Sequence, residues 1–511
     1  MHPEKTRQAQ TTGNSKRRAE RQGTFSRREF VRRGALLAGA AAATPFAVDL
    51  AGVTGAAGAS TSDGYKALVC VFMLGGNDHY NTIVPYDQAS YNAYAAARGD
   101  LAHSRQSLRP LNPTGGFNDG RSVAFANELS SLHALFGQGA VALVPNVGAL
   151  VQSIRKFEYG NAAKVPKQLF SHNDQQSMWQ SLAPEGASTG WGGRIADLML
   201  DDNGQHSAFT SISAGGNAVF LAGREATQFH VSPSGIVQLD MPFNSPAVQQ
   251  GLNALMSRAG GDDLYTQAYS DITRRALGTA SFLKDAVRQA GGVQSSFPDG
   301  LLGGQLRAVA ELIVAGRNVL GLKRQVFFVG LRGFDVHDTL ATTHRELLRE
   351  LDAGLSAFYR ATVQLGLADE VTTFTASDFG RSLVTNGTGS DHGWGSHHLV
   401  MGGAVNGGRS YGELPIIAND GPHDVGQGRL IPTTSVEQYA ATLATWMGAS
   451  SNELSAVLPS LDRFEVSDLG FMKNGSEGLA GSIGAATRTE GFTTANEILR
   501  ELQQRSEDGV R

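Results

Sequence analysis

Acidic and histidine side chains follow three separate apolar runs in this sequence of 511 residues. Asp78 comes after the first run, Asp335 and His337 come after the second, and Asp378 comes after the third, with His392 shortly beyond. Carboxylate oxygens bind hard divalent ions, and imidazole suits zinc, manganese or iron. Each residue alone is more often a helix cap, a surface charge or a buried histidine. Their repeated placement predicts a site for one or two divalent metal ions, with zinc, manganese, iron, calcium and magnesium as candidates.

The runs that precede these side chains predict strands of a buried sheet. Residues 66–74, 325–331 and 371–375 are largely apolar or β-branched, which is typical of central strands covered on both faces. Parallel strands bring their carboxyl ends to one edge of a sheet, where open α/β folds bind ligands. We therefore expect the acids and histidines to converge at that edge. The stretch 339–365 predicts an amphipathic helix beside the sheet.

Ser171 is a second candidate for chemistry. It precedes a helical pattern, and Asp174 follows at the third helical position, so the local sequence favours a simple N-cap. The functional alternative is a nucleophilic hydroxyl at a helix N-terminus, where the dipole and the free N–H groups favour an anionic ester.

Two other motif classes have little support. Residues 186–190 satisfy the G-x-S-x-G pattern of serine hydrolases, but that motif requires a preceding core strand, and here a loop with Pro184 and Glu185 precedes it. In a chain with 63 glycines we interpret the match as chance. The sequence contains no G-x-x-x-x-G-K-[S/T] motif, so a P-loop is not expected.

The first 60 residues resemble a signal peptide and linker. Arg27 and Arg28 precede an Ala- and Gly-rich apolar run over 34–47, as in twin-arginine export signals. The run is too short and too weakly apolar for a permanent membrane span. We expect export of the folded chain by the twin-arginine translocase to the periplasm or the extracellular space. The alternative is a disordered basic tail.

Composition and charge restrict the partners. Hydrophobic residues make up 41% of the chain and charged residues 18%, which is ordinary for a globular protein. Residues 1–47 carry ten Lys or Arg and three Asp or Glu, so the net charge of −4 becomes −11 without them. This acidic balance argues against nucleic acid as a partner. The only cysteine, Cys70, lies in an apolar run and is expected to be a core thiol.

We expect two regions after the signal. An α/β domain spans 61–480, and a polar C-terminal tail follows over 481–511. Within the domain, residues from about 246 to 320 have a helical pattern and predict a mainly helical insertion or cap. Such a cap would control access to the site, as lids do.

Six short motifs occur in an order that resembles the exported bacterial family called domain of unknown function 1501: LGGND at 74–78, SHNDQQ at 171–176, GFDVH at 333–337, SDFGR at 377–381, DHGWG at 391–395 and GRLIPT at 428–433. The family is placed in the alkaline phosphatase and sulfatase superfamily. The resemblance implies a doubly wound α/β/α sandwich of that type, with two metal ions at strand ends and a Ser, Thr or modified Cys nucleophile.

The resemblance also implies a role for individual residues. Ser171 is the nearest match to the nucleophile. Phe379 stands where the superfamily commonly has a histidine. The last histidine ligand matches His392 or one of His397 and His398. The implied metal ligands are Asp78, Asp335, His337, Asp378, His392 and His398.

Two functions compete on this basis. The first is a metal-dependent hydrolase of phosphate or sulfate esters of unknown small-molecule or polymeric kind. In that reading Arg381 holds a nonbridging oxygen of the substrate. The second is a non-catalytic exported protein that keeps the fold for binding or cell-surface assembly, since fold does not imply function. Metal content separates the two.

Overall fold

A central sheet of eight strands organises the molecule. The structure is a computed structural model that describes residues 64–117, 120–235, 247, 248, 250, 251, 254 and 278–473. The expected signal segment and the tail over 481–511 lie outside the described residues, as does most of the region 236–277. In the described part the strand order is β13-β5-β12-β9-β1-β8-β6-β7.

Seven strands of this sheet run parallel and one runs against them. β1 lies at the centre, paired in parallel with β8 on one side and β9 on the other, while β12 is antiparallel to both β9 and β5. β12 can run antiparallel to β9 because residues 378–395, which join the two strands, contain a short two-stranded hairpin and no crossover helix. The strand bounds are β1 Lys66–Leu74, β5 Val141–Gly148, β6 Ser211–Ser213, β7 Phe229–His230, β8 Arg324–Arg332, β9 Val371–Ser377, β12 Ser396–Met401 and β13 Thr434–Ser435.

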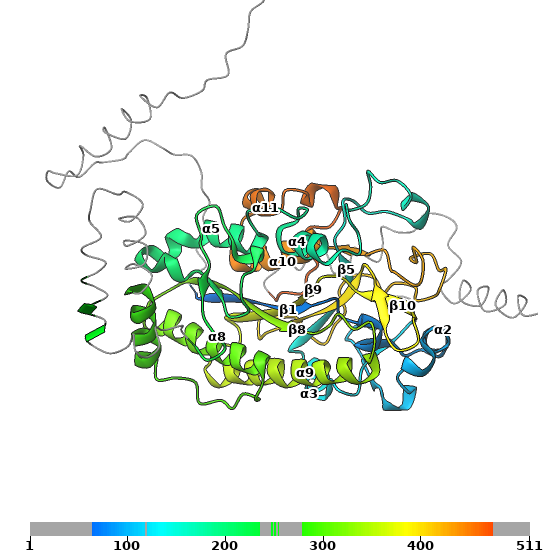
Figure 1. The fold of residues 1–511 in the computed structure, drawn as a ribbon, viewed down its shortest axis with the longest axis horizontal. Helices are drawn as coiled ribbons and strands as arrows, with labels where there is room; N and C mark the ends of the chain where they lie inside the picture. Colours follow the sequence, from blue (N-terminus) through cyan, green and yellow to red (C-terminus); the bar gives the residue numbers. More distant parts are fainter. Residues whose placement is uncertain are drawn as a thin grey trace, which may run out of the picture. The chain divides into compact units, whose positions relative to one another are not determined.

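Helices cover both faces of the sheet (Figure 1). One layer contains α4 His172–Ser181, α5 Trp191–Asn203, α10 Val436–Met447 and α11 Ser451–Val457. The other contains α3 Ser130–Gly137, α8 Leu301–Asn318 and α9 Leu340–Gln364. Alternate residues of β1 face the two layers, so Val69 and Val71 join one apolar core while Leu68, Cys70 and Phe72 join the other. This doubly wound α/β/α sandwich confirms the predicted fold class.

Smaller elements surround the sandwich. β2 Ile83–Pro85, β4 Val123–Phe125 and β3 Arg109–Pro110 form a three-stranded sheet, and β10 Arg381–Thr385 pairs with β11 Ser390–His392. α2 Gln88–Arg98 packs beside β10. The 3-10 helices are η1 His79–Asn81, η2 Gly99–Leu101, η3 Arg105–Ser107, η4 Lys156–Glu158, η5 Gly204–Phe209, η6 Val219–Leu221 and η7 Leu461–Arg463.

The expected strands over 66–74, 325–331 and 371–375 coincide with β1, β8 and β9. The expected helix over 339–365 is α9. The predicted insertion over about 246–320 falls partly outside the described residues. Its last part is α8, which packs against α9 and β8 and so belongs to a sandwich layer and not to a cap. Among the described helices, none is long and apolar enough to cross a membrane.

Candidate metal centre

The carboxyl edge of the sheet collects the polar side chains of three elements. β8 and β9 both pair in parallel with β1, so the residues that follow these strands emerge at the same edge. Asp335 follows β8, and Asp378 directly follows β9. α4 begins at this edge with His172, and β11 ends there with His392.

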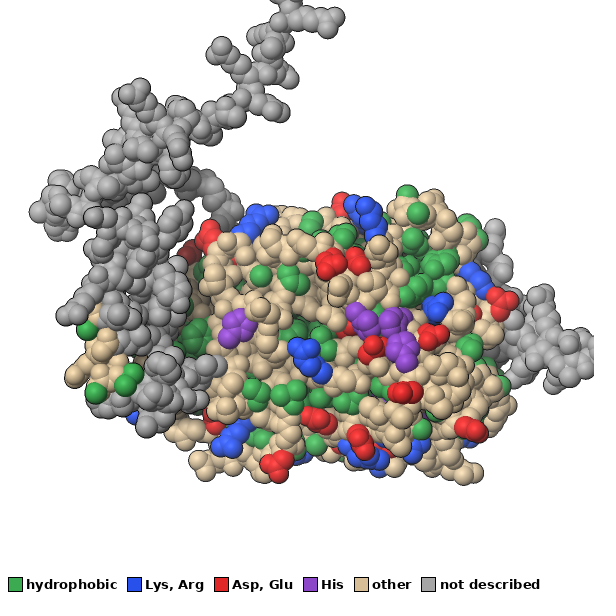
Figure 2. Space-filling view, viewed as in Figure 1, with side chains coloured by type: hydrophobic (Ala, Val, Ile, Leu, Met, Phe, Trp, Pro, Cys, Tyr) green, Lys and Arg blue, Asp and Glu red, His purple; other side chains and the backbone are tan. Residues whose placement is uncertain are grey.

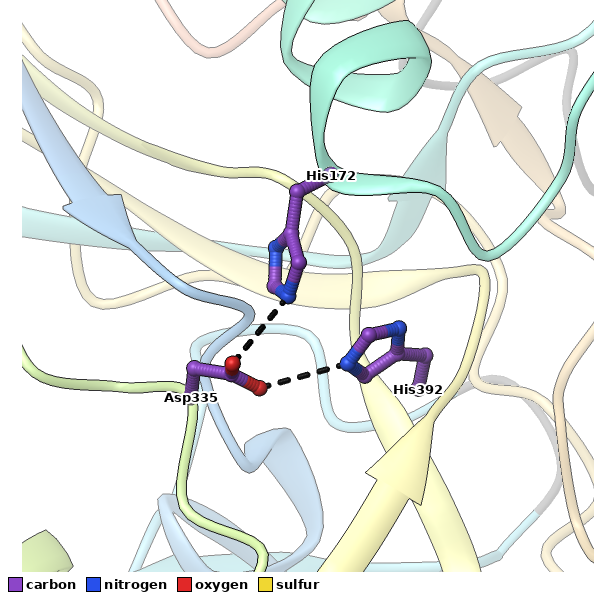
Figure 3. A group of neighbouring side chains, drawn as sticks. All are labelled: His172, Asp335 and His392. Carbon is purple, nitrogen blue, oxygen red and sulfur yellow. Dashed lines mark hydrogen bonds and ion pairs between the residues drawn. The ribbon is translucent and has the colours of Figure 1, made fainter.

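Three imidazoles converge on the carboxylate of Asp335. Nε2 of His172 lies 3.3 Å from Oδ2 of Asp335, and Nε2 of His392 lies 3.2 Å from Oδ1 (Figure 3). Nε2 of His337 lies 2.9 Å from the same Oδ1 and 3.0 Å from Nε2 of His392. Nδ1 of His337 lies 3.5 Å from Oδ1 of Asp391. Asp335, His172, His337 and His392 form what we call the Asp335 cluster.

The cluster is open to solvent. Asp335 and His337 are each 45% exposed, whereas His172 is 28% and His392 is 23% exposed. On the face of the molecule seen in Figure 2, histidine side chains (purple) gather beside acidic side chains (red). A ligand can therefore reach the carboxylate from outside while the rings remain supported by the protein.

The second ring nitrogen of two histidines is held by an acceptor. Nδ1 of His172 lies 2.7 Å from Oδ2 of Asp378, and Nδ1 of His392 lies 2.7 Å from the backbone carbonyl oxygen of Phe170. A carbonyl or an ionised carboxylate only accepts hydrogen bonds, so Nδ1 carries the proton in the neutral ring. Nε2 of each ring then presents its lone pair toward the cluster. Such partners are typical of histidines that ligate metals.

This arrangement fits a divalent metal ion. The lone pairs of His172 and His392 face the carboxylate oxygens of Asp335, and acceptors this close repel unless positive charge lies between them. Nε2 of His172 is buried without a hydrogen-bond partner among the described residues. One ligand atom from each of these three residues lies within 4.8 Å of the others. Ligand atoms about 2.1 Å from one ion are about 3.0–3.4 Å apart. The separations of Nε2 of His172 and of His392 from the Asp335 oxygens, 3.3 and 3.2 Å, lie in this range.

The donor set narrows the choice of metal. His172, His337 and His392 supply imidazole nitrogen, and only Asp335 supplies oxygen. Calcium and magnesium prefer oxygen ligands, whereas zinc, manganese and iron accept imidazole with carboxylate. The cluster therefore suits zinc, manganese or iron best, and it provides ligands for one ion.

Neighbouring charges set the protonation of the cluster. The hydrogen bond to Asp378 raises the pKa of His172 above its ordinary value, although burial opposes it. Burial lowers the pKa of His392. Burial raises the pKa of Asp335, but the hydrogen bond from Arg381 and the nearby positive charges outweigh it and bring the value to about 2. At neutral pH Asp335 is thus a carboxylate and His392 a neutral ring, the forms that bind metal.

Arg381 orients Asp335 and does not face a substrate. Its Nη1 donates to Oδ1 of Asp335 at 2.9 Å and to the carbonyl oxygen of Gly75 at 3.0 Å, and its Nε donates to the carbonyl oxygen of Ser390 at 3.1 Å. The side chain is fully buried. The expectation that Arg381 holds a substrate oxygen is therefore corrected, because its N–H groups already donate to acceptors within the protein.

Asp378 lies behind His172. Its Oδ2 accepts from Nδ1 of His172 and from Nε2 of Gln176 at 2.7 Å each, and its Oδ1 accepts from the backbone N–H of Gly75 at 3.1 Å. The carboxylate is fully buried. Three donors occupy it, so Asp378 supports His172, which is a candidate ligand, and is not itself one of the candidate ligands.

The backbone at Phe170 is strained where it supports His392. Phe170 has φ of 71°, a left-handed conformation that is unusual for an aromatic residue. Its carbonyl oxygen accepts from His392, and the Arg429 guanidinium lies 4.9 Å from its ring centroid. The ring of Phe379 packs against both imidazoles, with its centroid 4.9 Å from that of His172 and 4.7 Å from that of His392. The histidines are thus fixed in both position and tautomer.

Two predicted ligands do not join the cluster. Asp78 turns to Arg98 instead: Oδ2 accepts from Nη1 at 2.9 Å and Oδ1 from Nη2 at 2.5 Å, with both side chains fully buried. His398 lies inside the sandwich, with its ring centroid 4.7 Å from that of Trp179 and its Nδ1 3.3 Å from Oγ1 of Thr375. Burial lowers its pKa to about 3. Both expectations are corrected by these pairings.

His397, the other alternative for the last histidine, is buried as well. Its Nδ1 accepts from the backbone N–H of Asn146 at 2.9 Å, and its ring packs edge-on against His79. His392 is therefore the late imidazole that reaches the edge.

Ser171 occupies the N-cap position of α4, as its sequence context predicts, but its side chain makes no capping hydrogen bond. The hydroxyl thus sits next to His172 without the structural role that the local sequence favoured. Nothing in the described contacts assigns it a nucleophilic role either.

Sequence analysis missed His172 and Gln176. Both lie within the SHNDQQ motif, one helical turn apart, so they occupy the same face of α4 and reach the same Asp378 oxygen. The available signal was this i, i+4 spacing at the start of the expected helix.

Fold and site together define an α/β/α sandwich protein with a histidine–aspartate cluster at the carboxyl edge of its sheet. The chain belongs to the family described as Protein of unknown function (DUF1501), which matches residues 65–458. This confirms the family expected from the six motifs.

Several solved structures are similar to this chain at low identity. A phosphonate monoester hydrolase from Silicibacter pomeroyi has 8% identity over 75% of this chain and 74% of its own, with a TM-score of 0.32. A putative sulfatase from Bacteroides thetaiotaomicron has 8% identity over 78% and 75%, with a TM-score of 0.29. No curated protein matches the sequence.

Proposed function

We propose that this protein is an exported metal-dependent hydrolase of phosphate or sulfate esters. The observation that carries the proposal is the convergence of three Nε2 atoms on Asp335, with the proton of His172 and of His392 held on the far ring nitrogen. His172, His337, His392 and Asp335 would hold the ion. A divalent ion there would supply Lewis-acid chemistry, which stabilises negative charge developing on a substrate oxygen.

The chain's own residues prepare the site. Asp378 and the carbonyl of Phe170 keep two imidazoles in the tautomer that leaves Nε2 free, and Arg381 keeps Asp335 ionised and oriented. Ser171 is the hydroxyl next to the cluster in sequence, at the N-terminus of α4, where unpaired backbone N–H groups favour an anion. We propose Ser171 as the nucleophile, with a solvent water as the alternative.

Elemental analysis combined with an activity panel tests this function. The protein purified from its native compartment should contain about one zinc, manganese or iron per chain, and should hydrolyse at least one of an aryl phosphate, a phosphate diester or an aryl sulfate. His392→Ala should lose both metal and activity. His230→Ala, which changes an exposed histidine of β7, is the matched control.

The outcomes separate the candidates. Protein without a bound divalent ion and without turnover would overturn the hydrolase and favour an exported binding or assembly protein. Activity that survives Ser171→Ala at full rate would exclude this serine as the nucleophile and leave water in that role.

The export route belongs to the same proposal. Arg27, Arg28 and the Ala-rich run that follows support passage of the folded, metal-loaded chain through the twin-arginine translocase into the periplasm or beyond. Replacing both arginines by lysine should trap the full-length precursor inside the cell. Normal export of that double variant would show that another route is used.

A further inference from the structure

A pocket opens beside the Asp335 cluster and shares two of its residues. Its volume is about 330 Å³, and His172 and Asp335 line it. Leu74 and Phe328 contribute apolar wall. A volume near 300 Å³ is at the lower end of small-molecule sites. A ligand whose reacting group sits at the cluster therefore has room to extend into this pocket.

Two glutamines present fixed amide groups there. Gln176 donates from Nε2 to Asp378, so the side-chain carbonyl oxygen of Gln176 remains as an acceptor. The backbone N–H of Phe220 donates to Oε1 of Gln180, so the side-chain N–H₂ of Gln180 remains as a donor. His172, Gln176 and Gln180 follow one another at four-residue spacing on α4 and form one stripe. One acceptor and one donor at set positions suit a ligand that carries hydroxyl groups.

One cation completes the pocket. Arg332 is the exposed last residue of β8 and lines the pocket with Asn217. Within residues 64–117, 120–235 and 278–473, no carboxylate pairs with Arg332, in contrast to Arg381, which is buried and bonded to Asp335. A guanidinium has fork geometry that matches oxyanions such as carboxylate, sulfate or phosphate.

We infer that this pocket binds the remainder of the substrate, a hydroxylated group with a second oxyanion that pairs with Arg332. The inference rests on the proposed function for the identity of the reacting group. The substrate class is thus a phosphate or sulfate ester whose alcohol part carries its own anionic group, such as an ester of an acidic sugar, and an ester of a simple neutral alcohol is a poor substrate.

Matched pairs of small esters test the inference. Phenyl phosphate is compared with 4-carboxyphenyl phosphate and with 4-sulfophenyl phosphate, and the same comparison is made for the aryl sulfates. The wild-type protein should have a kcat/KM about ten-fold higher for esters with the second anion. In Arg332→Met that ratio should fall to about one, while Arg332→Lys should retain part of it. Arg360→Met changes an exposed arginine of α9 outside this pocket and should keep the wild-type ratio.

Binding of non-hydrolysable analogues separates this inference from the proposed function. Titration calorimetry with 4-carboxyphenylphosphonate and phenylphosphonate should show the same preference and the same loss in Arg332→Met. If no ester is hydrolysed but this preference persists, the hydrolase is wrong and the anion pocket stands. Equal affinity for the two phosphonates in the wild-type protein, or an unchanged preference in Arg332→Met, would overturn the pocket assignment whatever the activity panel shows.

Discussion

Nδ1 of His172 lies 2.7 Å from Oδ2 of Asp378, a carboxylate with no exposed surface. The pair joins the start of α4 to the end of β9, two segments about 200 residues apart in the chain. Because the buried acid accepts the Nδ1 proton, the opposite nitrogen of His172 keeps its lone pair directed at Asp335. This hydrogen bond makes the N-terminal residue of α4 a candidate metal ligand.

Asp378→Asn tests this support. An amide N–H₂ directed at His172 would require Nδ1 to accept, which moves the ring proton to Nε2 and removes the lone pair from the cluster. We expect metal affinity to fall about 10- to 100-fold with the fold intact. Competition with a chelator measures the affinity, and Asp201→Asn, an exposed position of α5, is the control. Unchanged affinity in Asp378→Asn would show that the pair does not position a ligand.

Metal removal gives a second prediction. An ion that binds only the folded chain stabilises it by about 2.7 kcal/mol at a free concentration 100 times its dissociation constant. Dialysis against a chelator should therefore lower the Tm of the wild-type protein, and zinc or manganese should restore it. His392→Ala should show neither change, because the site lacks one imidazole. If neither the chelator nor the added metal changes the Tm of the wild-type protein, the protein does not bind an ion at this site.

The buried pair of Asp78 and Arg98 gives a third prediction: breaking the pair lowers the stability of the fold but leaves the bound metal in place. Removing one partner leaves an uncompensated buried charge, which costs about 3–5 kcal/mol. Arg98→Met should therefore lower the free energy of unfolding by about that amount, and Asp78→Leu combined with Arg98→Met should recover part of it. Denaturant titration measures both. Asp78→Asn should retain the metal stoichiometry of the wild-type protein; a lost ion would return Asp78 to the ligand set.

The sheet could be predicted from the sequence because its strands are long apolar runs. β1 agrees with the prediction residue for residue, and β9 and α9 agree within two residues. The placement of Asp335 and His337 followed from that sheet, since a side chain directly after a parallel strand has to emerge at the carboxyl edge.

The partners of Asp78 and His172 could not be predicted from the sequence, because they lie on segments that are distant along the chain. Asp78 also follows a strand, but its partner Arg98 lies on α2, and no local pattern identifies that pairing in advance. His172 becomes a ligand candidate only because Asp378, far along the chain, stands behind it. Local sequence states where a side chain leaves its strand or helix, but not which distant charge it meets.

A last prediction concerns pH and Glu437 of α10. Its side chain is 2% exposed, one carboxylate oxygen lacks a hydrogen-bond partner among the described residues, and burial raises its pKa to about 7. The folded state therefore binds a proton more tightly than the unfolded chain, whose value is 4.5. Between these two values the folded state carries more protons, so this residue makes stability fall as pH rises.

Glu437→Gln removes that dependence. The variant should be more stable than the wild-type protein at pH 8 by up to about 3 kcal/mol, with the advantage shrinking through pH 7 and vanishing near pH 4. Buried histidines such as His398 also titrate in acid and lower stability there, but they are common to both proteins and cancel in the difference. Unfolding in denaturant at several pH values measures it, with exposed Glu346→Gln of α9 as control. A difference independent of pH would mean that Glu437 stays ionised inside the fold.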